Sequence, residues 1–306
     1  MSFFSLISKI LPLYIITVQG YIAGRLHEID TKSLSKLMFH FLMPVIFFDV
    51  ALNTKLELRY ILLPVLYFIF CVILRTVSLF IGSKFFDDGR EKIIGYAAGS
   101  VNTSSLGLSI AMLIFDNNYI RIFMLSTIGL MTYVYTVGNY TISNNIKSSK
   151  RRLPYLLKLP PMYGFAIGII ANISDIRLFD GFNNLFSQMR AAYLVLGMMI
   201  FGLSLSKVKL NGGVKFISIF VLSKTLISPL LYLSFILLDK FVFHIYDNEM
   251  YKLFFLLSAL PPGVDCIITC NLYNKFPEKA AIALLVSTII STIYIPFFLQ
   301  FFNNAT

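Results

Sequence analysis

The sequence predicts an all-α polytopic membrane protein with ten transmembrane helices, arranged as two inverted five-helix repeats. Of its 306 residues, 57% are hydrophobic and only 13% are charged, which is too apolar for a soluble domain of this length. Its apolar runs approach the roughly 20 residues that an α-helix needs to cross a bilayer. Two of these runs are interrupted at corresponding places in the two halves of the chain, which indicates a repeat.

The expected spans follow one another with short loops between them. The first is too long for a signal-peptide core and no small-residue cleavage site follows a short apolar stretch, so we expect it to remain as a membrane helix. The sixth is the shortest and needs flanking residues to reach across the membrane. The spans are expected at 3–24, 34–52, 60–83, 93–115, 122–144, 162–173, 186–205, 214–238, 253–271 and 280–302.

The ninth span is interrupted by the stretch Ser-Ala-Leu-Pro-Pro-Gly-Val-Asp at 258–265. Pro261 and Pro262 lack backbone donors and their rings clash with the preceding turn, so an ordinary helix cannot continue through them. In lipid, the freed backbone groups must find partners inside the protein or face a water-filled cavity. A packed proline kink without a ligand would use the same residues. Secondary transporters place their binding sites at such joints, and a second broken span favours this interpretation.

The fourth span is the second broken one, because its centre is polar and lies between Gly99 and Gly107. Asn, Ser and Thr side chains compete for backbone hydrogen bonds and favour helix caps over helix interiors. We therefore expect two half-helices in each broken span, the second ones beginning near 103–105 and near 263–265. Their N-terminal ends would expose backbone donors and a positive dipole end, where a carboxylate is stabilised.

The two halves of the chain carry related features in the same order. The third span contains Arg75-Thr76 and the eighth contains Lys224-Thr225, and the fourth span of each half is the broken one. Five spans per half force the repeats into opposite orientations, which is the inverted-repeat plan of many transporters. We predict a first repeat at 1–146, a basic linker at 147–160 and a second repeat at 161–306.

Positive charge is distributed unevenly between the two sets of loops. Cytoplasmic loops carry the excess of Lys and Arg, so we expect the central linker in the cytoplasm and both termini outside, in the cell membrane. The net charge of +11 is scattered over short loops without a basic stripe or recognition motif, which argues against nucleic-acid binding. The side of the linker carries sixteen Lys and Arg residues and the side of the termini seven. The sixteen are Arg25, Lys32, Lys36, Lys84, Arg90, Lys92, Lys147, Lys150, Arg151, Arg152, Lys158, Lys207, Lys209, Lys215, Lys275 and Lys279, and the seven are Lys55, Arg59, Arg121, Arg177, Arg190, Lys240 and Lys252.

No catalytic or metal-binding pattern is present in the sequence. Cys71, Cys266 and Cys270 lie in apolar runs with no disulfide framework, and the Cys-x-x-x-Cys pair lacks partner ligands for zinc. The sequence also shows no nucleophile–base pair, no His/Glu cluster and no phosphate-binding glycine loop. We therefore expect a protein that is not an enzyme and holds no cofactor or metal.

Ionisable residues inside apolar runs are costly in lipid and mark functional candidates. Lys224 is interpreted either as an anion attractor or coupling switch, or as a lysine paired with a carboxylate that locks the bundle. Arg75 is open in the same way, since its long side chain can reach the interface. For Asp49 we favour a structural pairing or snorkelling role, and for His40 a packing role.

At Asp265 two effects oppose each other. Burial disfavours the charged carboxylate, whereas the adjacent half-helix N-terminus and a nearby cation, for which Lys224 is the candidate, favour it. A group balanced in this way can exchange a proton during a transport cycle, and a bound sodium ion would instead hold it ionised.

Four patches carry a resemblance to a known family. They are Leu34-x-x-Leu-x-Phe-x-Phe-Leu-x-Pro44, Asn102-Thr103-x-x-Leu-Gly107, Ala259-x-Pro261-Pro262, and Ser287-Thr288-x-x-Ser291 with Pro296 beyond. With these patches the chain resembles the auxin efflux carrier family, which includes bacterial malonate/malate-type permeases and plant PIN-type carriers. It departs from the bacterial pattern at Ser104, Ser109 and Asp265, where Gly, Pro and Asn are usual.

The resemblance implies a scaffold of spans 1, 2, 6 and 7 and a mobile unit of spans 3 to 5 and 8 to 10. The broken spans would cross, and a small organic anion would bind beside the crossing. The half-helix ends inferred from the residues lie at a similar place. The expected substrate-binding residues are Asn102, Thr103, Ser104, Ser105, Pro261, Pro262 and Gly263, with Asp265, Lys224 and Arg75 as coupling or charged residues.

These features predict a secondary transporter that moves a small organic anion by alternating access, with proton coupling as one possibility. A sodium-coupled organic-anion symporter of bile-acid type is the alternative within the same class, because Asn102, Ser104, Ser105 and Asp265 could supply oxygen ligands. A non-transporting scaffold or sensor derived from a transporter is the alternative outside it. Substrate, direction, coupling ion and oligomeric state, including a homodimer, are left open.

Overall fold

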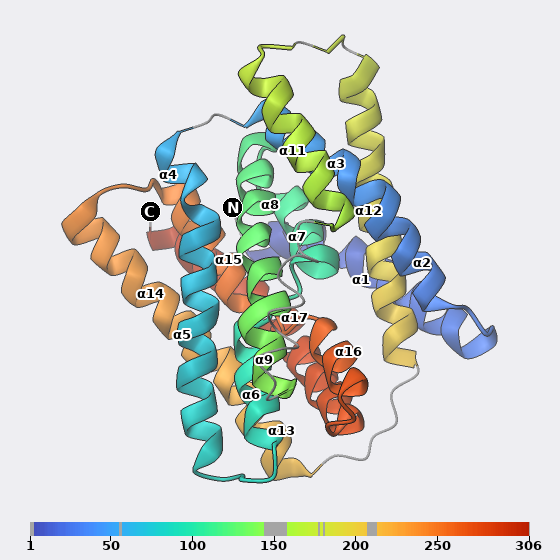
Figure 1. Cartoon of the computed structure of the whole chain (residues 1–306), viewed down its shortest axis with the longest axis vertical. Helices are drawn as coiled ribbons and strands as arrows, with labels where there is room; N and C mark the ends of the chain where they lie inside the picture. The colour runs from blue at the N-terminus through green and yellow to red at the C-terminus, as the bar shows by residue number, and fades with distance from the viewer. Residues whose placement is uncertain are drawn as a thin grey trace.

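The computed structural model describes residues 3–54, 57–143, 158–176, 178–179, 181–206 and 213–305, and over these residues it contains helices and no strand. Helices occupy every range in which the sequence predicts a span (Figure 1). Residues 147–157 of the expected linker lie outside the described part of the chain.

The described residues of the first half form nine α-helices joined by short loops and π-helical turns. Its broken fourth span comprises α6 and α7, which are separated by a non-helical segment at 100–102 and the π-helical turn Thr103–Gly107. The helices are α1 (Phe3–Leu26), α2 (Thr31–Leu37), α3 (Met43–Asn53), α4 (Leu58–Ile61), α5 (Leu63–Ser83), α6 (Arg90–Gly99), α7 (Leu108–Ile114), α8 (Asn117–Tyr133) and α9 (Asn139–Ser143).

The second half begins at α11, and its broken ninth span comprises α15 and α16, separated by the non-helical segment 260–264. The end of α14 runs into a π-helical turn at Asp239–Phe243, which extends the eighth span beyond its expected end. The helices are α11 (Pro160–Ile173), α12 (Gly181–Ser206), α13 (Val214–Leu222), α14 (Ser228–Leu238), α15 (Asn248–Ala259), α16 (Asp265–Leu272) and α17 (Pro277–Ala305).

Six of the described helical segments are long and apolar enough to cross a membrane, and α11 is a shorter apolar helix. The chain is therefore a multi-pass membrane protein. The two broken spans are not among the six, because neither half-helix reaches the required length alone. The six segments are 33–53, 58–83, 117–143, 181–206, 214–243 and 277–296.

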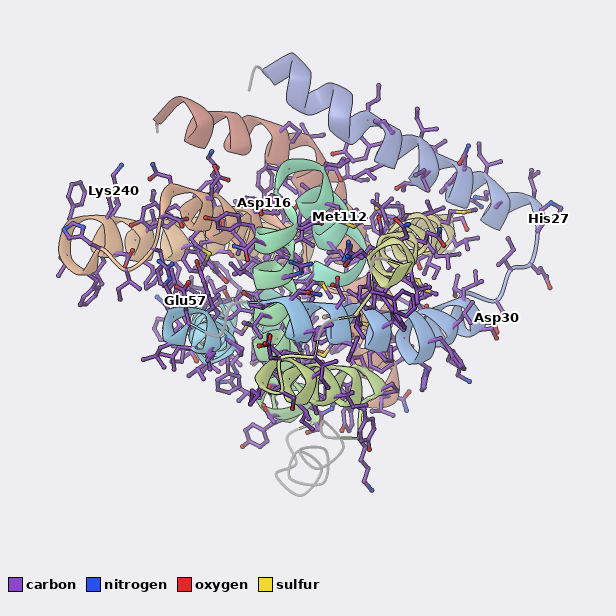
Figure 2. The ribbon with its side chains drawn as sticks, turned by 90° about the horizontal axis from the view of Figure 1, so that it is seen from above. His27, Asp30, Glu57, Met112, Asp116 and Lys240 are labelled. Atoms are coloured by element: carbon purple, nitrogen blue, oxygen red, sulfur yellow. The ribbon has the colours of Figure 1, made fainter. Side chains whose placement is uncertain are left out.

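The helices of the two halves are interleaved in space. In Figure 1, α6 and α16 lie in the lower part of the molecule and α7 and α15 in the upper part, so the two broken spans form a cross near the centre. Figure 2 shows α1 and α17 along one edge, with His27 and Asp30 marking the loop that leads from α1 into α2.

Several pairs of helices approach each other through glycine, among them α1–α12 and α3–α11. A Cβ on Gly202 of α12 would lie 2.0 Å from the carbonyl oxygen of Thr17 on α1, and one on Gly164 of α11 would lie 2.0 Å from the carbonyl oxygen of Pro44 on α3. Small residues at helix interfaces let backbones pack closely in membranes, where the hydrophobic effect does not drive helix association. The α1–α12 and α3–α11 pairs are thus fixed by backbone-to-backbone contact.

This packing predicts that Gly164→Ala destabilises the protein although it adds only a methyl group. The methyl would overlap the α3 backbone, and overpacking of this kind costs about 1–3 kcal/mol. We expect a lower melting temperature for the purified protein in detergent. Gly213→Ala is the matched control, since a Cβ there meets nothing within 4 Å. Equal melting temperatures for the two variants would contradict the close α3–α11 contact.

Candidate functional site at the crossing of the two broken spans

The two breaks bind each other through their backbones. The Asn102 N–H donates to the carbonyl oxygen of Pro261 over 2.8 Å. The Gly263 N–H donates to Ser100 Oγ over 3.3 Å, which makes a second link in the opposite direction. Donors of each unwound segment thus meet acceptors of the other, as a low-dielectric environment requires.

Local chemistry ends each first half-helix at its break. Leu260 precedes Pro261 and takes an extended conformation with φ −65° and ψ 143°, because a proline ring disfavours the helical conformation of the preceding residue. At Gly99, the last residue of α6, a Cβ would lie only 2.6 Å from the Tyr133 hydroxyl. Glycine at this position therefore gives Tyr133 access to the end of α6.

A tyrosine hydroxyl binds the carbonyl end of each first half-helix. Tyr133 of α8 donates to the Tyr96 carbonyl oxygen of α6 over 3.1 Å. Tyr294 of α17 donates to the Ala259 carbonyl oxygen at the end of α15 over 2.6 Å. The Tyr96 carbonyl oxygen also accepts the Ser100 N–H over 3.0 Å, so Tyr133 adds a second hydrogen bond there. Carbonyl groups at a helix end need partners from outside the helix, and Tyr294 supplies one to Ala259.

Most of the predicted binding residues are brought together here. Asn102 and Thr103 are buried, as are Pro261, Pro262 and Gly263. Asp265 begins α16 and is half-buried, at the N-terminal end of the second half-helix. The side chains of Ser104 and Ser105 lie outside the described residues.

Lys224 reaches the same region from the eighth span. Its side chain is fully buried, and its Nζ lies 3.5 Å from the carbonyl oxygen of Ala98 in the last turn of α6. Within the described part of the chain no carboxylate lies within 4.0 Å of this Nζ. The ammonium group instead faces the negative end of a helix dipole, which favours a cation.

Arg75 takes a different position from its counterpart in the second half. Its Nε donates to Thr141 Oγ1 on α9 over 2.9 Å, so it ties α5 to the end of the fifth span. Among the described residues, this hydrogen bond of the guanidinium group goes to α9 and not to a residue of either break. Arg75 and Lys224, which the sequence predicts to be counterparts, therefore make unlike contacts.

Asp49 forms a buried ion-pair cluster away from the breaks. Its carboxylate is bound by Arg190 of α12 and lies 3.5 Å from Arg121 of α8, and Asn53 donates to it over 2.9 Å. The Asp49 residue is only 2% exposed. This geometry is the structural pairing that the sequence favours for Asp49.

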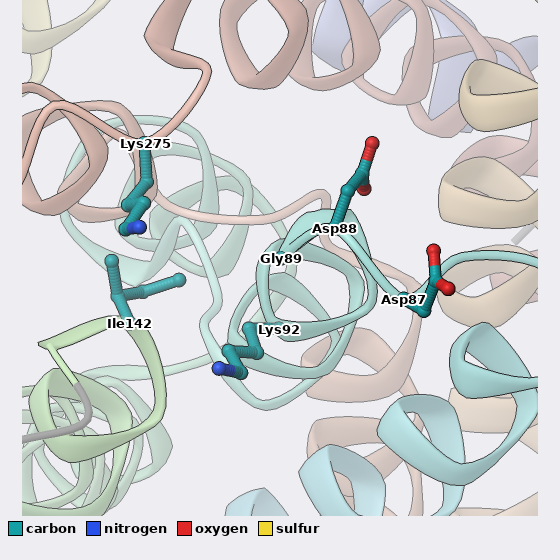
Figure 3. A pocket seen from close by; sticks show the side chains of 6 residues that line it. All are labelled: Asp87, Asp88, Gly89, Lys92, Ile142 and Lys275. Carbon is teal, nitrogen blue, oxygen red and sulfur yellow. The ribbon is translucent and has the colours of Figure 1, made fainter.

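A separate pocket of about 230 Å³ lies at the far end of α6 from the break. In Figure 3, Lys92 and Lys275 lie on one side of it and Asp87 and Asp88 on the other. Arg90 binds Asp88 over 2.9 Å and lowers the pKa of that carboxyl through the hydrogen bond. The ten residues of α6 place this pocket about 15 Å from the break.

A family profile described as membrane transport protein matches residues 5–299. The chain belongs to the membrane transport protein family. This membership confirms the resemblance to auxin efflux carriers, because it is the same family. An uncharacterized transporter of Methanocaldococcus jannaschii is 25% identical to this membrane transport protein over 307 residues, covering 94% of this chain and 95% of the relative.

Three residues that form hydrogen bonds at the crossing are absent from the site predicted from the sequence of this membrane transport protein. Ser100 accepts the Gly263 N–H, and Tyr133 and Tyr294 bind the half-helix ends. Ser100 lies inside the polar stretch that predicts the fourth-span break, so its position was a usable signal. The tyrosines carry no such signal, because each lies in an ordinary apolar span. In the described residues, no group of three His, Cys, Asp or Glu side chains is placed to hold a metal ion.

The Asp49 cluster predicts that Asp49→Asn strongly destabilises this membrane transport protein. Removing one partner of a buried ion pair leaves an uncompensated charge, here on Arg190, and costs about 3–5 kcal/mol. Glu57→Gln is the control, since the Glu57–Arg59 pair is exposed and such pairs contribute about 0–1 kcal/mol. Thermal unfolding of the two purified variants should separate them clearly. A melting temperature of Asp49→Asn equal to that of Glu57→Gln would contradict the structural role.

Proposed function

We propose that this protein is a secondary transporter that moves a small organic anion across the membrane by alternating access. The observation that carries the proposal is the crossing of two broken spans, in which backbone groups of Asn102, Pro261 and Gly263 meet at the centre of a membrane transport family member. Secondary transporters form their binding sites from such discontinuous helices.

The proposed architecture is a ten-span inverted repeat. An inverted repeat exchanges span 1 with span 6 and span 2 with span 7, so it turns the α1–α12 contact into the α11–α3 contact. Both contacts are built on glycines, Gly202 in one and Gly164 in the other. The tyrosines at the half-helix ends, Tyr133 and Tyr294, likewise come from the fifth span of each half. These paired features support the repeat.

The proposed division into moving parts follows the same contacts. The scaffold would consist of α1 to α3, α11 and α12, and the mobile unit of the remaining helices. The bonds between the broken spans lie entirely within the mobile unit, so the substrate site would move without being dismantled. The bias of positive loop charge supports an orientation with the central linker in the cytoplasm and both termini on the outer side of the cell membrane.

The crossing favours a negatively charged ligand. The second half-helices begin beside Thr103 and Asp265, and helix N-termini stabilise anions through their donors and dipole. Lys224 adds a buried positive charge that is not within 4.0 Å of a carboxylate among the described residues. A carboxylate group of the substrate would supply the missing charge.

Transport by purified protein in liposomes tests this proposal directly. We expect uptake or exchange of at least one labelled dicarboxylate, monocarboxylate or indole acid, above that of protein-free liposomes. Each substrate is offered with a proton gradient, with a sodium gradient and with neither, which separates the two coupling ions. Absence of movement of every anion by folded protein would favour a non-transporting sensor.

Lys224→Met is expected to weaken substrate binding while the protein still folds. Among the described residues no carboxylate lies within 4.0 Å of Lys224 Nζ, so the mutation leaves no carboxylate there without its partner. Methionine also keeps the length and the apolar character of the side-chain stem. A loss of at least tenfold in apparent affinity should appear in liposome exchange. Lys215→Met is the control on the same span, since Lys215 is exposed and lies over the rings of Phe85 and Phe86. Unchanged affinity in a folded Lys224→Met protein would remove Lys224 from the site.

Asp265→Asn is expected to separate exchange from gradient-driven transport. Asparagine has nearly the same shape but cannot take up a proton or bring a negative charge to a sodium ion, so substrate exchange should continue and accumulation should stop. Both rates are measured on the same liposomes, under a proton gradient and under a sodium gradient. Accumulation at the parental rate under both gradients would show that Asp265 only caps α16.

A further inference from the structure

A second cavity, of about 360 Å³, is lined by residues of α3, α4, α5, α8 and α11. Val50 of α3, Thr54 at the C-cap of α3 and Ile169 of α11 form one side of it. Pro64 of α5 and Leu125 of α8 form the other side. The cavity therefore lies between two scaffold helices and helices of the proposed mobile unit, and we call it the groove.

The lining of this groove offers at most one polar side chain to a ligand or to water. Thr54 is the one polar residue among those that line it, and its hydroxyl already donates to the Val50 carbonyl oxygen. A buried water molecule needs two to four polar partners, so water is a poor occupant. Hydrocarbon suits the groove because it needs no hydrogen bonds.

The groove opens toward the lipid-facing surface of the protein. Ile61 and Ile173 line it and remain 48% and 71% exposed. Their neighbours Val65 and Ile170 are 55% and 64% exposed on the apolar outside of α5 and α11. In a multi-pass membrane protein such side chains face lipid tails, so a hydrocarbon chain has direct access to the groove.

We propose that one acyl chain of a membrane phospholipid occupies this groove as a bound ligand. The occupancy rests on the membrane location of these helices, while its consequence rests on the proposed transport function. A chain held between α3 and α11 on one side and α5 and α8 on the other lies where scaffold and mobile unit slide past each other. It must shift or leave in each transport cycle, so filling the groove permanently slows transport.

Tryptophan fluorescence tests the occupancy, because the natural chain contains no tryptophan. Phe165→Trp places a reporter in the groove, with Ile169→Trp as a second reporter if the first variant does not fold. Ile170→Trp is the control, exposed to bulk lipid on the same helix. Each variant is reconstituted with increasing fractions of phospholipid carrying brominated acyl chains, and separately titrated with acrylamide.

One bound chain predicts that groove fluorescence falls in proportion to the brominated fraction, as for a single site. Ile170→Trp, which several chains reach, should give a steeper, curved loss, and acrylamide should quench neither strongly. Acrylamide quenching confined to the groove reporter would show water there. Absence of bromine quenching would show that side chains close the groove, and a curve equal to that of Ile170→Trp would show bulk lipid only. Each of these three results overturns the proposal.

The consequence for transport is measured with the same variants. Ile169→Trp adds bulk inside the groove and should lower the rate of substrate exchange several-fold at unchanged substrate affinity, whereas Ile170→Trp should exchange at the natural rate. Equal exchange rates would remove the role in transport. If no variant and no natural protein transports any anion, the proposed function fails, and the quenching result still decides whether the groove holds lipid.

Discussion

The structure depends on one constraint, which is that backbone groups freed inside a membrane must be satisfied within the protein. Two interrupted helices would each be too costly alone. Here the Asn102 N–H donates a hydrogen bond to the Pro261 carbonyl oxygen over 2.8 Å. The Gly263 N–H donates a second one in the other direction, to Ser100 Oγ. Each break is therefore the hydrogen-bonding partner of the other, and neither span can adopt its shape independently.

Side chains from neighbouring helices bind the ends of the half-helices at the two breaks. The tyrosines of α8 and α17 bind the carbonyl ends of α6 and α15, which couples the fifth span of each half to its fourth. Lys224 approaches the negative end of α6 rather than a carboxylate, so its charge is balanced by a dipole that carries about half an elementary charge. A substrate anion would complete this balance, which links the fold of the crossing to the proposed specificity.

The sequence predicted the all-helical fold, the membrane class and both break positions, because these follow from local properties. Proline removes donors wherever it lies in a helix, and apolar length can be read directly from the chain. Partner choice could not be predicted in the same way. Arg75 and Lys224 carry the same local signal, yet Arg75 binds Thr141 and Lys224 faces Ala98. Tyr133 and Tyr294 bind helix ends only because the fold brings those ends close to their hydroxyls. Such a contact between distant segments cannot be read from local patterns in one sequence.

Cross-linking of the two breaks tests their contact most directly. A Cβ placed on Gly263 would lie 2.9 Å from Ser100 Oγ, the atom that a cysteine sulfur would replace. This short distance is compatible with a disulfide, in which the two Cβ atoms lie about 3.5–4.5 Å apart. Ser100→Cys and Gly263→Cys are combined in a protein whose Cys71, Cys266 and Cys270 are replaced by alanine, and the folded protein is mildly oxidised. Thiol labelling is then measured in denaturant, before and after reduction, because both positions are buried in the folded protein. Direct contact between the two breaks predicts that both thiols become protected together and are recovered by reduction, while each single-cysteine protein stays labelled. Two thiols that remain free in the folded, oxidised double variant would contradict it.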